Sequence, residues 1–137
     1  MWFIYAFLSA VFAGITAILG KIGIQGINSN LATAIRTIVV LIFSWGIVVA
    51  TGKHVELGSI NQKSLLFLVL SGIATGLSWL CYYKSLQIGE ASKVIPVDKF
   101  SIVIGMVLAY LVLKETVTMK SIIGGILITL GCIVLVL

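Results

Sequence analysis

The segment that decides the fold class is Met1–Gly20, MWFIYAFLSAVFAGITAILG, which carries no charge and is closed by Lys21. An α-helix rises 1.5 Å per residue, so about 20 apolar residues cross the roughly 30 Å hydrocarbon core of a bilayer. The segment is too long and too evenly apolar for a signal peptide, and no basic residue precedes it. It therefore predicts a transmembrane helix.

Four further segments match the first in length and hydropathy. They cover about residues 31–51, 64–83, 94–113 and 119–137, and only Arg36, Asp98 and Lys99 place charges inside them. The longest connector, Gly52–Lys63, is too short to form an extramembrane domain. The sequence therefore predicts a single all-α integral membrane domain over residues 1–137, with helices at about 1–20 and at these four segments.

The composition excludes the other common protein classes. Hydrophobic residues make up 61% of the chain and charged residues 9%, whereas a soluble domain has about 45–50% and 25%. Such hydrophobicity also excludes intrinsic disorder. The net charge of +5 comes from single basic residues between apolar runs, which is typical of loop lysines at lipid headgroups and does not indicate nucleic-acid binding.

No pattern in the sequence points to catalysis, a metal or a cofactor. Cys81 and Cys132 each lie inside an apolar run, and the only histidine, His54, lies in a polar loop. There is no CxxC motif, phosphate-binding loop or nucleophile–base pair. We therefore expect a protein that is not an enzyme and that uses no metal or cofactor.

The connectors and the small residues carry structural signals. The run Asn28-Ser29-Asn30 offers an N-cap for the second helix, and Thr118 is placed to cap the fifth. Gly52-Lys53 suits a helix C-terminus, with Gly52 in the left-handed conformation. Small residues recur at helical spacing, which allows helices to pack closely or to slide past one another. These small-residue stripes include Gly72 with Gly76, Ser101 with Gly105 and Ala109, and Ser121 with Gly125 and Thr129.

Aromatic residues fall into two groups by depth. Trp2 and Tyr5 fit one membrane interface, and Tyr82 and Tyr83 fit the other. Trp45, Trp79 and Tyr110 lie deeper, where they either fill packing space or contact a solute. We retain Trp79 and Tyr110 as site candidates because a polar N–H or O–H group within a membrane needs a partner.

The loop charges give almost no orientation bias. With five spans, one membrane face carries four basic residues and the other five, counting Arg36 and Lys99 just inside their helices. The positive-inside rule then favours neither orientation strongly. Two alternatives stay open: one weakly set orientation with the N-terminus inside, or insertion both ways. The second would allow an antiparallel homodimer of ten helices with inverted-repeat architecture.

Three stretches resemble the EamA family of the drug/metabolite transporter superfamily. They are the segment from Leu8 to the closing Lys21, the segment Lys84-Ser85-Leu86 to Pro96 with Gly89-Glu90-Ala91-Ser92 between, and Leu113-Lys114-Glu115-Thr116-Val117-Thr118 followed by Gly124-Gly125 and Gly131. The third resembles the family's Gly-Glu-x-x-Thr junction and is the most specific. Lys114 stands where the family usually has Gly, and Glu115 matches the structural acid of that junction.

The resemblance covers the whole chain as one five-helix repeat. It implies a multi-pass protein of a bacterial or archaeal plasma membrane that moves small metabolites or drug-like molecules. Most family members carry two such repeats in inverted orientation, so the resemblance also implies pairing with a second copy. The family motifs are structural and do not encode the substrate.

Two charges inside the spans are the strongest site candidates. A charge inside a span costs several kcal/mol unless it is paired or hydrated. Arg36 lies about six residues past Asn30, and Asp98 lies about four residues into the fourth segment, on the same membrane face. They could form a structural pair, line a cavity for substrate or protons, or reach the headgroups. Lys99 falls about 100° away from Asp98 around the helix.

Pro96 leaves the start of the fourth helix open to two interpretations. A start near Val94 makes the missing N–H harmless, whereas a start at Ser92 removes one hydrogen bond and kinks the helix beside Asp98. The sequence as a whole predicts a transporter of small organic solutes that works by alternating access as a homodimer. A lipid-linked-sugar flippase subunit and a non-transporting assembly subunit remain the alternatives.

Overall fold

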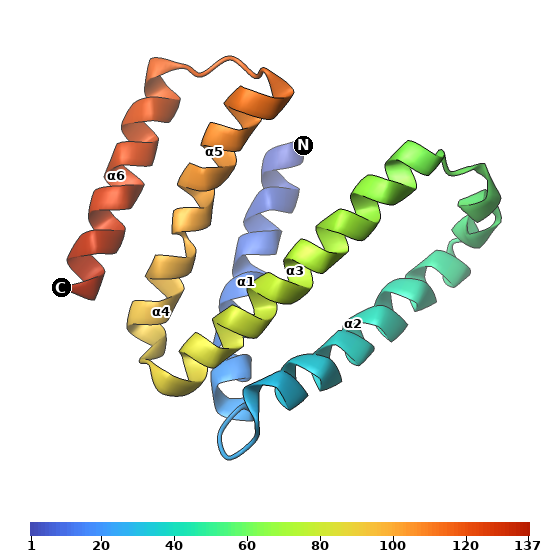
Figure 1. The fold of residues 1–137 in the computed structure, drawn as a ribbon, viewed down its shortest axis with the longest axis horizontal. Coiled ribbons are helices and arrows are strands. Elements are labelled where there is room, and N and C mark those ends of the chain that lie inside the picture. The colour runs from blue at the N-terminus through green and yellow to red at the C-terminus, as the bar shows by residue number, and fades with distance from the viewer. The chain divides into compact units, whose positions relative to one another are not determined.

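A computed structural model describes residues 1–137 and contains helices and no strands. The elements follow one another along the chain in Figure 1. They are α1 (Trp2–Gly23), α2 (Ser29–Ala50), the 3₁₀ helix η1 (Lys53–Ser59), α3 (Gln62–Ile88), α4 (Ala91–Asp98), α5 (Phe100–Leu113) and α6 (Met119–Val136). With Ala91–Leu113 counted as one span, five segments are long and apolar enough to cross a membrane. The all-helical architecture with five spans is therefore confirmed.

The expected helix ends are present. The Asn28 side chain accepts hydrogen bonds from the N–H groups of Asn30 and Leu31, and Thr118 accepts from Ser121 N–H. Gly52 follows α2 in the left-handed conformation, with a φ of 70°. Each cap satisfies backbone groups that a helix leaves without an intrahelical partner.

The third and fourth helices differ from their expected bounds. Helix α3 extends to Ile88, beyond the expected end at residue 83. The fourth span begins at Ala91 and is interrupted at Lys99, where α4 gives way to α5. Pro96 lies inside α4, so the hydrogen bond that its N–H would make is missing. At the break, Lys99 N–H bonds to Pro96 O at 3.0 Å, a tight i to i−3 turn.

Helix α5 ends on a non-glycine residue in the left-handed conformation. Lys114 has a φ of 55° and is the only non-glycine residue with positive φ. The N–H groups of Lys114 and Glu115 both bond to Ala109 O, five and six residues back, so each bond spans more residues than the i to i−4 bond of an α-helix. A glycine would adopt this conformation without a Cβ penalty.

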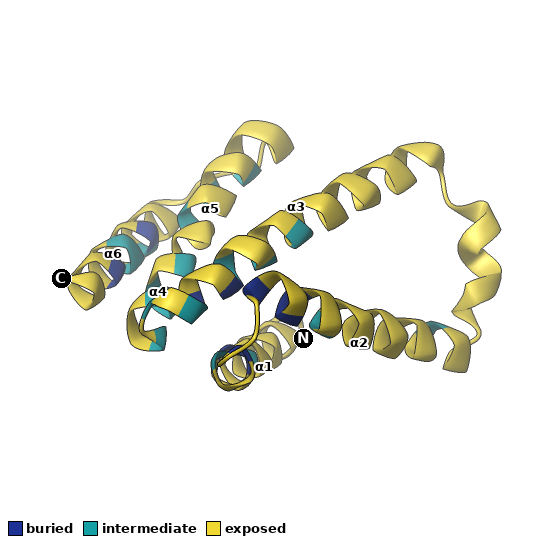
Figure 2. Cartoon of the chain, turned by 60° about the horizontal axis from the view of Figure 1, so that its bottom comes forward, coloured by how far each residue is buried: buried dark blue, intermediate teal, exposed yellow.

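The chain divides into two compact units, Leu19–Gln87 and Met1–Ile18 with Ile88–Leu137, and each is described by itself. Figure 2 shows that exposed residues dominate the helices other than α4, in which residues of intermediate burial are more numerous. Large apolar side chains such as Phe43 and Leu127 are more than 60% exposed. Side chains on a membrane span face lipid, which is as apolar as they are, so the chain does not need to bury them.

Buried residues are few and gather in small clusters. In Leu19–Gln87 the largest fully buried side chains are Ile24, Tyr83 and Leu86. In the other unit, α4 and α5 both pack against α6, where Gly125 and Cys132 are buried. Close helix contact is therefore confined to short stretches of the spans.

Candidate functional site

Aromatic side chains of α3 surround the partly buried side chain of Arg36. Its guanidinium carbon Cζ is 4.4 Å from the centroid of the Tyr83 ring and 5.7 Å from that of the Trp79 ring. Arg36 comes from the second turn of α2, and both rings come from α3. Trp79 and Tyr83 are four residues apart, so they share one helix face.

Tyr83 is 1% exposed, so its ring packs among the helices of this unit, and its place at a membrane interface stays a prediction. The ring lies against Gly20 of α1, where a Cβ would be 2.7 Å from the ring atom Cε1. The absent side chain of Gly20 thus makes room for the ring. The spacing of Trp79 and Tyr83 on α3 was the sequence signal that could have placed Tyr83 beside Trp79. We call Gly20, Arg36, Trp79 and Tyr83 the aromatic corner.

Two long-range hydrogen bonds hold the helices together near the aromatic corner. The Lys21 ammonium donates to Leu86 O, and the Gln87 amide donates to Ile27 O at 2.6 Å. Lys21 lies in the last turn of α1, and Leu86 and Gln87 lie in the last turn of α3. The first bond satisfies a carbonyl group at the C-terminal end of α3, which needs a partner outside the helix, and the second satisfies a carbonyl group in the loop between α1 and α2. They fix the end of α3 against the end of α1 and the loop that follows it.

The contacts of Arg36 leave its charge incompletely compensated. A cation over an aromatic ring gains about 0.5–2 kcal/mol, whereas an arginine at the centre of a span costs about 2.5–3.5 kcal/mol on insertion scales. The guanidinium atom Nη1 is buried and has no hydrogen-bond partner. An unpaired buried donor is unfavourable, so the aromatic corner can accept a negatively charged or hydrogen-bonding group.

Asp98 and Lys99 lie at the break between α4 and α5. The Lys99 ammonium is 3.4 Å from the Asp98 carboxylate, and both side chains are partly exposed. The interruption of the helix that Pro96 produces thus places an acid and a base side by side. Arg36 belongs to the other unit, so the pairing of Arg36 with Asp98 stays a prediction.

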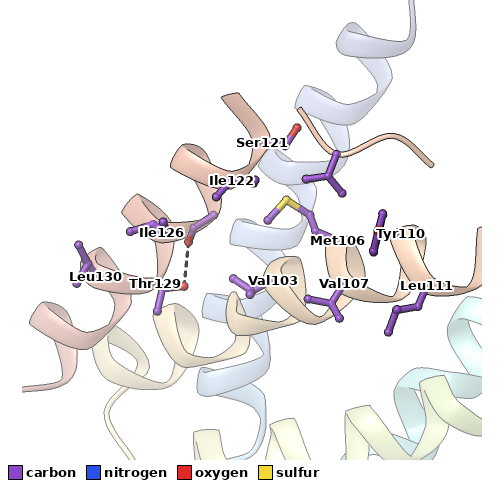
Figure 3. A pocket seen from close by; sticks show the side chains of 12 residues that line it. Val103, Met106, Val107, Tyr110, Leu111, Ser121, Ile122, Ile126, Thr129 and Leu130 are labelled. Carbon is purple, nitrogen blue, oxygen red and sulfur yellow. Dashed lines mark hydrogen bonds between the residues drawn. The ribbon is translucent and has the colours of Figure 1, made fainter. Parts of the chain in front are cut away.

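Tyr110 lies in a groove between α5 and α6 with a volume of about 400 Å³. Figure 3 shows side chains of the two helices converging on it, with Met106 between them. The lining is almost entirely apolar, and the hydroxyl of Thr129 is already bonded to Gly125 O at 2.9 Å. The groove therefore favours an apolar occupant over a charged one.

The glycines singled out from the sequence differ in their surroundings. A Cβ built on Gly72, Gly76 or Gly105 meets no atom within 4 Å, whereas one built on Gly125 would lie 2.5 Å from Met106 Cε. Gly125 therefore serves packing between α5 and α6. The other three leave open helix surface, and their part in helix packing stays a prediction.

Comparison with known proteins connects this architecture to transport. An uncharacterized transporter of Sinorhizobium sp., from the cobO 3′ region, is 42% identical over 134 residues, which cover 98% of this chain and 95% of that protein. An uncharacterized protein of Methanocaldococcus jannaschii is 30% identical and covers 96% of this chain and 93% of its own length.

A longer relative matches over part of its length. An uncharacterized transporter of Synechocystis sp. is 29% identical over 92% of this chain but only 37% of its own. No solved structure matches the chain. The model of the EamA-like transporter family matches residues 1–137, and together with the five spans this match identifies the chain as a multi-pass plasma-membrane protein that belongs to the EamA-like transporter family.

Proposed function

We propose that the protein carries small organic solutes across the membrane by alternating access. The observation that carries this proposal is the family match over the whole chain. The cluster of Arg36 with Trp79 and Tyr83 supports it, since an ionisable group within a span is a functional candidate by default. Asp98 with Lys99, and Tyr110, are the further candidates for solute or proton contact.

The working form is an antiparallel homodimer of two five-helix repeats. Two relatives match this chain over 95% and 93% of their own length, whereas the Synechocystis transporter is much longer than the matched region. A longer chain can hold two repeats, and a chain of one repeat reaches the same architecture by pairing. The open surfaces at Gly72, Gly76 and Gly105 support close approach of another helix.

Transport is tested with purified protein in proteoliposomes. Ligands are first found by thermal shift, because a ligand that binds the folded state raises its stability. We expect protein-dependent uptake of a ligand identified in this way. Ligands that bind but never cross the bilayer would support a non-transporting subunit, and movement of a lipid-linked sugar would support the flippase alternative.

The antiparallel arrangement is tested by cysteine labelling. Cys81 and Cys132 are replaced, and one cysteine is placed at Gly58 in the loop after α2 or added after Leu137. Five spans put these positions on opposite faces, so dual insertion labels each from outside in about half of the molecules. Labelling of only one position would contradict dual insertion.

The dimer contact is tested by Gly105→Leu. A leucine here meets no atom of the chain within 4 Å of its Cβ, so the monomer should fold unchanged while crosslinked dimer decreases. Gly124→Leu is the matched control, because its surroundings are equally open. An unchanged dimer fraction for Gly105→Leu would mean that this face of α5 contacts lipid.

A further inference from the structure

We propose that Arg36, with Trp79 and Tyr83 beside it, binds an oxyanion of the transported solute, in the first place a carboxylate. The inference rests on the proposed transport function and assigns the chemical class of its substrate. It is carried by the unpartnered guanidinium nitrogen, by its aromatic surroundings and by the distribution of charge in Leu19–Gln87.

The aromatic contacts leave one buried nitrogen of the Arg36 guanidinium, Nη1, without a hydrogen-bond partner. Guanidinium donors lie in the plane of the group and point outward from its edges. The Tyr83 and Trp79 rings face Cζ at 4.4 and 5.7 Å. Nη1 is buried without a partner. A carboxylate fits such an edge with two parallel hydrogen bonds, which a point charge such as lysine does not provide.

The charges of this unit favour an anion. Glu56 is the only acidic residue in Leu19–Gln87, and its carboxylate is 2.6 Å from the Lys53 ammonium. The basic residues Lys21 and Lys84 lie near the ends of α1 and α3, on the membrane face where α2 begins. The N-terminal end of α2 adds a positive partial charge. This field attracts anions and repels cationic solutes.

The burial pattern leaves a route to the guanidinium. Tyr83 is fully buried, whereas Arg36 and Trp79 each keep part of their surface open. Arg36 is therefore not sealed by its neighbours, and part of its surface is accessible to a ligand. The indole of Trp79 then changes its environment when the site fills, and it serves as a fluorescent reporter.

Binding is measured on purified protein with Trp2→Phe and Trp45→Phe, in which Trp79 is the only tryptophan. The probes are acetate, butyrate and hexanoate, each compared with its amide and its amine of equal length. We expect saturable changes in Trp79 fluorescence with the carboxylates and none with the amides or amines. No saturable response to any carboxylate, or an equal response to the amines, would overturn the proposal.

Three variants distinguish the contribution of the Arg36 guanidinium to carboxylate binding from that of the net charge. Arg36→Gln should raise the Kd for the best carboxylate about tenfold or more, the loss expected for a charged hydrogen bond. Arg36→Lys keeps the charge but loses the planar edge, so it should weaken binding in a protein that still folds. Lys63→Gln removes one charge at an exposed position of the same unit and should bind normally. Equal weakening by Lys63→Gln would overturn the assignment to Arg36.

A lipid phosphate offers the same oxyanion chemistry as a solute. Titrations in phosphatidylcholine nanodiscs with and without phosphatidylglycerol separate the two sources, and we expect carboxylate binding to persist in both. Complete loss with phosphatidylglycerol would overturn the solute assignment and make Arg36 a lipid contact.

Uptake in proteoliposomes separates this proposal from the transport function. Carboxylates that bind through Arg36 but never cross would refute transport and leave the site intact. Uptake of an amine without carboxylate binding would refute the site and leave transport intact.

Discussion

The aromatic corner and the groove between α5 and α6 each contain a tyrosine and a glycine, but the tyrosine is buried in the corner and exposed in the groove. Tyr83 is 1% exposed, whereas Tyr110 is 56% exposed. In the corner, Gly20 of α1 lies against a rigid aromatic ring, while in the groove Gly125 lies against the flexible end of Met106. The difference shows that a small residue closes a site only where its neighbour is rigid and a third helix contributes, since a two-helix hairpin leaves its outer face open.

The largest expected effect separates the two tyrosines. Tyr83→Ala should lower the free energy of unfolding by about 3–5 kcal/mol, because it empties a fully buried volume. Tyr110→Ala removes an exposed side chain and should change the free energy by about 0.5 kcal/mol or less. Unfolding in detergent, followed by circular dichroism, measures both. Equal losses would show that the groove is as tightly packed as the corner.

The two glycines give the next largest contrast. Gly20→Ala forces a methyl group against the Tyr83 ring and should cost about 1–3 kcal/mol through overpacking. Gly125→Ala meets only Met106 Cε, which can rotate away, so its cost should stay below about 1 kcal/mol. Gly14→Ala, with no atom within 4 Å of its Cβ, is the control. Thermal unfolding ranks the three, and a harmless Gly20→Ala would mean that the Tyr83 ring is mobile.

The turn after α5 offers a stabilising change. Lys114→Gly removes a Cβ from the left-handed position at φ 55° and should raise the free energy of unfolding by about 0.5–1 kcal/mol. The gain is limited because glycine also increases the entropy of the unfolded chain. Lys120→Gln removes a charge from the same region without changing the backbone and serves as the comparison. A loss of stability in Lys114→Gly would point to a contact made by the lysine side chain.

The smallest expected effect concerns the two intramembrane charges. If Arg36 serves a solute and Asp98 remains with Lys99, the stability effects of Arg36→Gln and Asp98→Asn should add within about 0.5 kcal/mol in the double variant. Breaking a buried pair typically costs about 3–5 kcal/mol for either single change, with the double change milder than that sum. Such strong coupling would establish a structural Arg36–Asp98 pair in place of an anion site.

The spans and caps were predictable because their signals are local. Twenty uncharged residues such as Met1–Gly20 match the bilayer thickness whatever surrounds them, and Asn28 caps α2 through its own neighbours. The sequence predicted a break near Lys99 only as one of two alternatives. Whether Pro96 removes a helical hydrogen bond depends on where the helix starts, and the sequence left that start open. The extension of α3 to Ile88 was missed because long-range hydrogen bonds hold its last turn. Lys21 donates to Leu86 O, and Gln87 donates to Ile27 O, and the partners are 60 or more positions apart in the sequence.

For the candidate site too, some features follow from the sequence and others only from the tertiary structure. The sequence by itself determined that Arg36 and Asp98 are costly charges within spans, because hydration free energy depends on residue type and depth. It also determined the membrane class of the chain through composition and segment length. Only the tertiary structure decided that the Tyr83 ring is buried against Gly20. That choice depends on the space at Gly20 and on the crossing of three helices, which no local pattern of residues specifies.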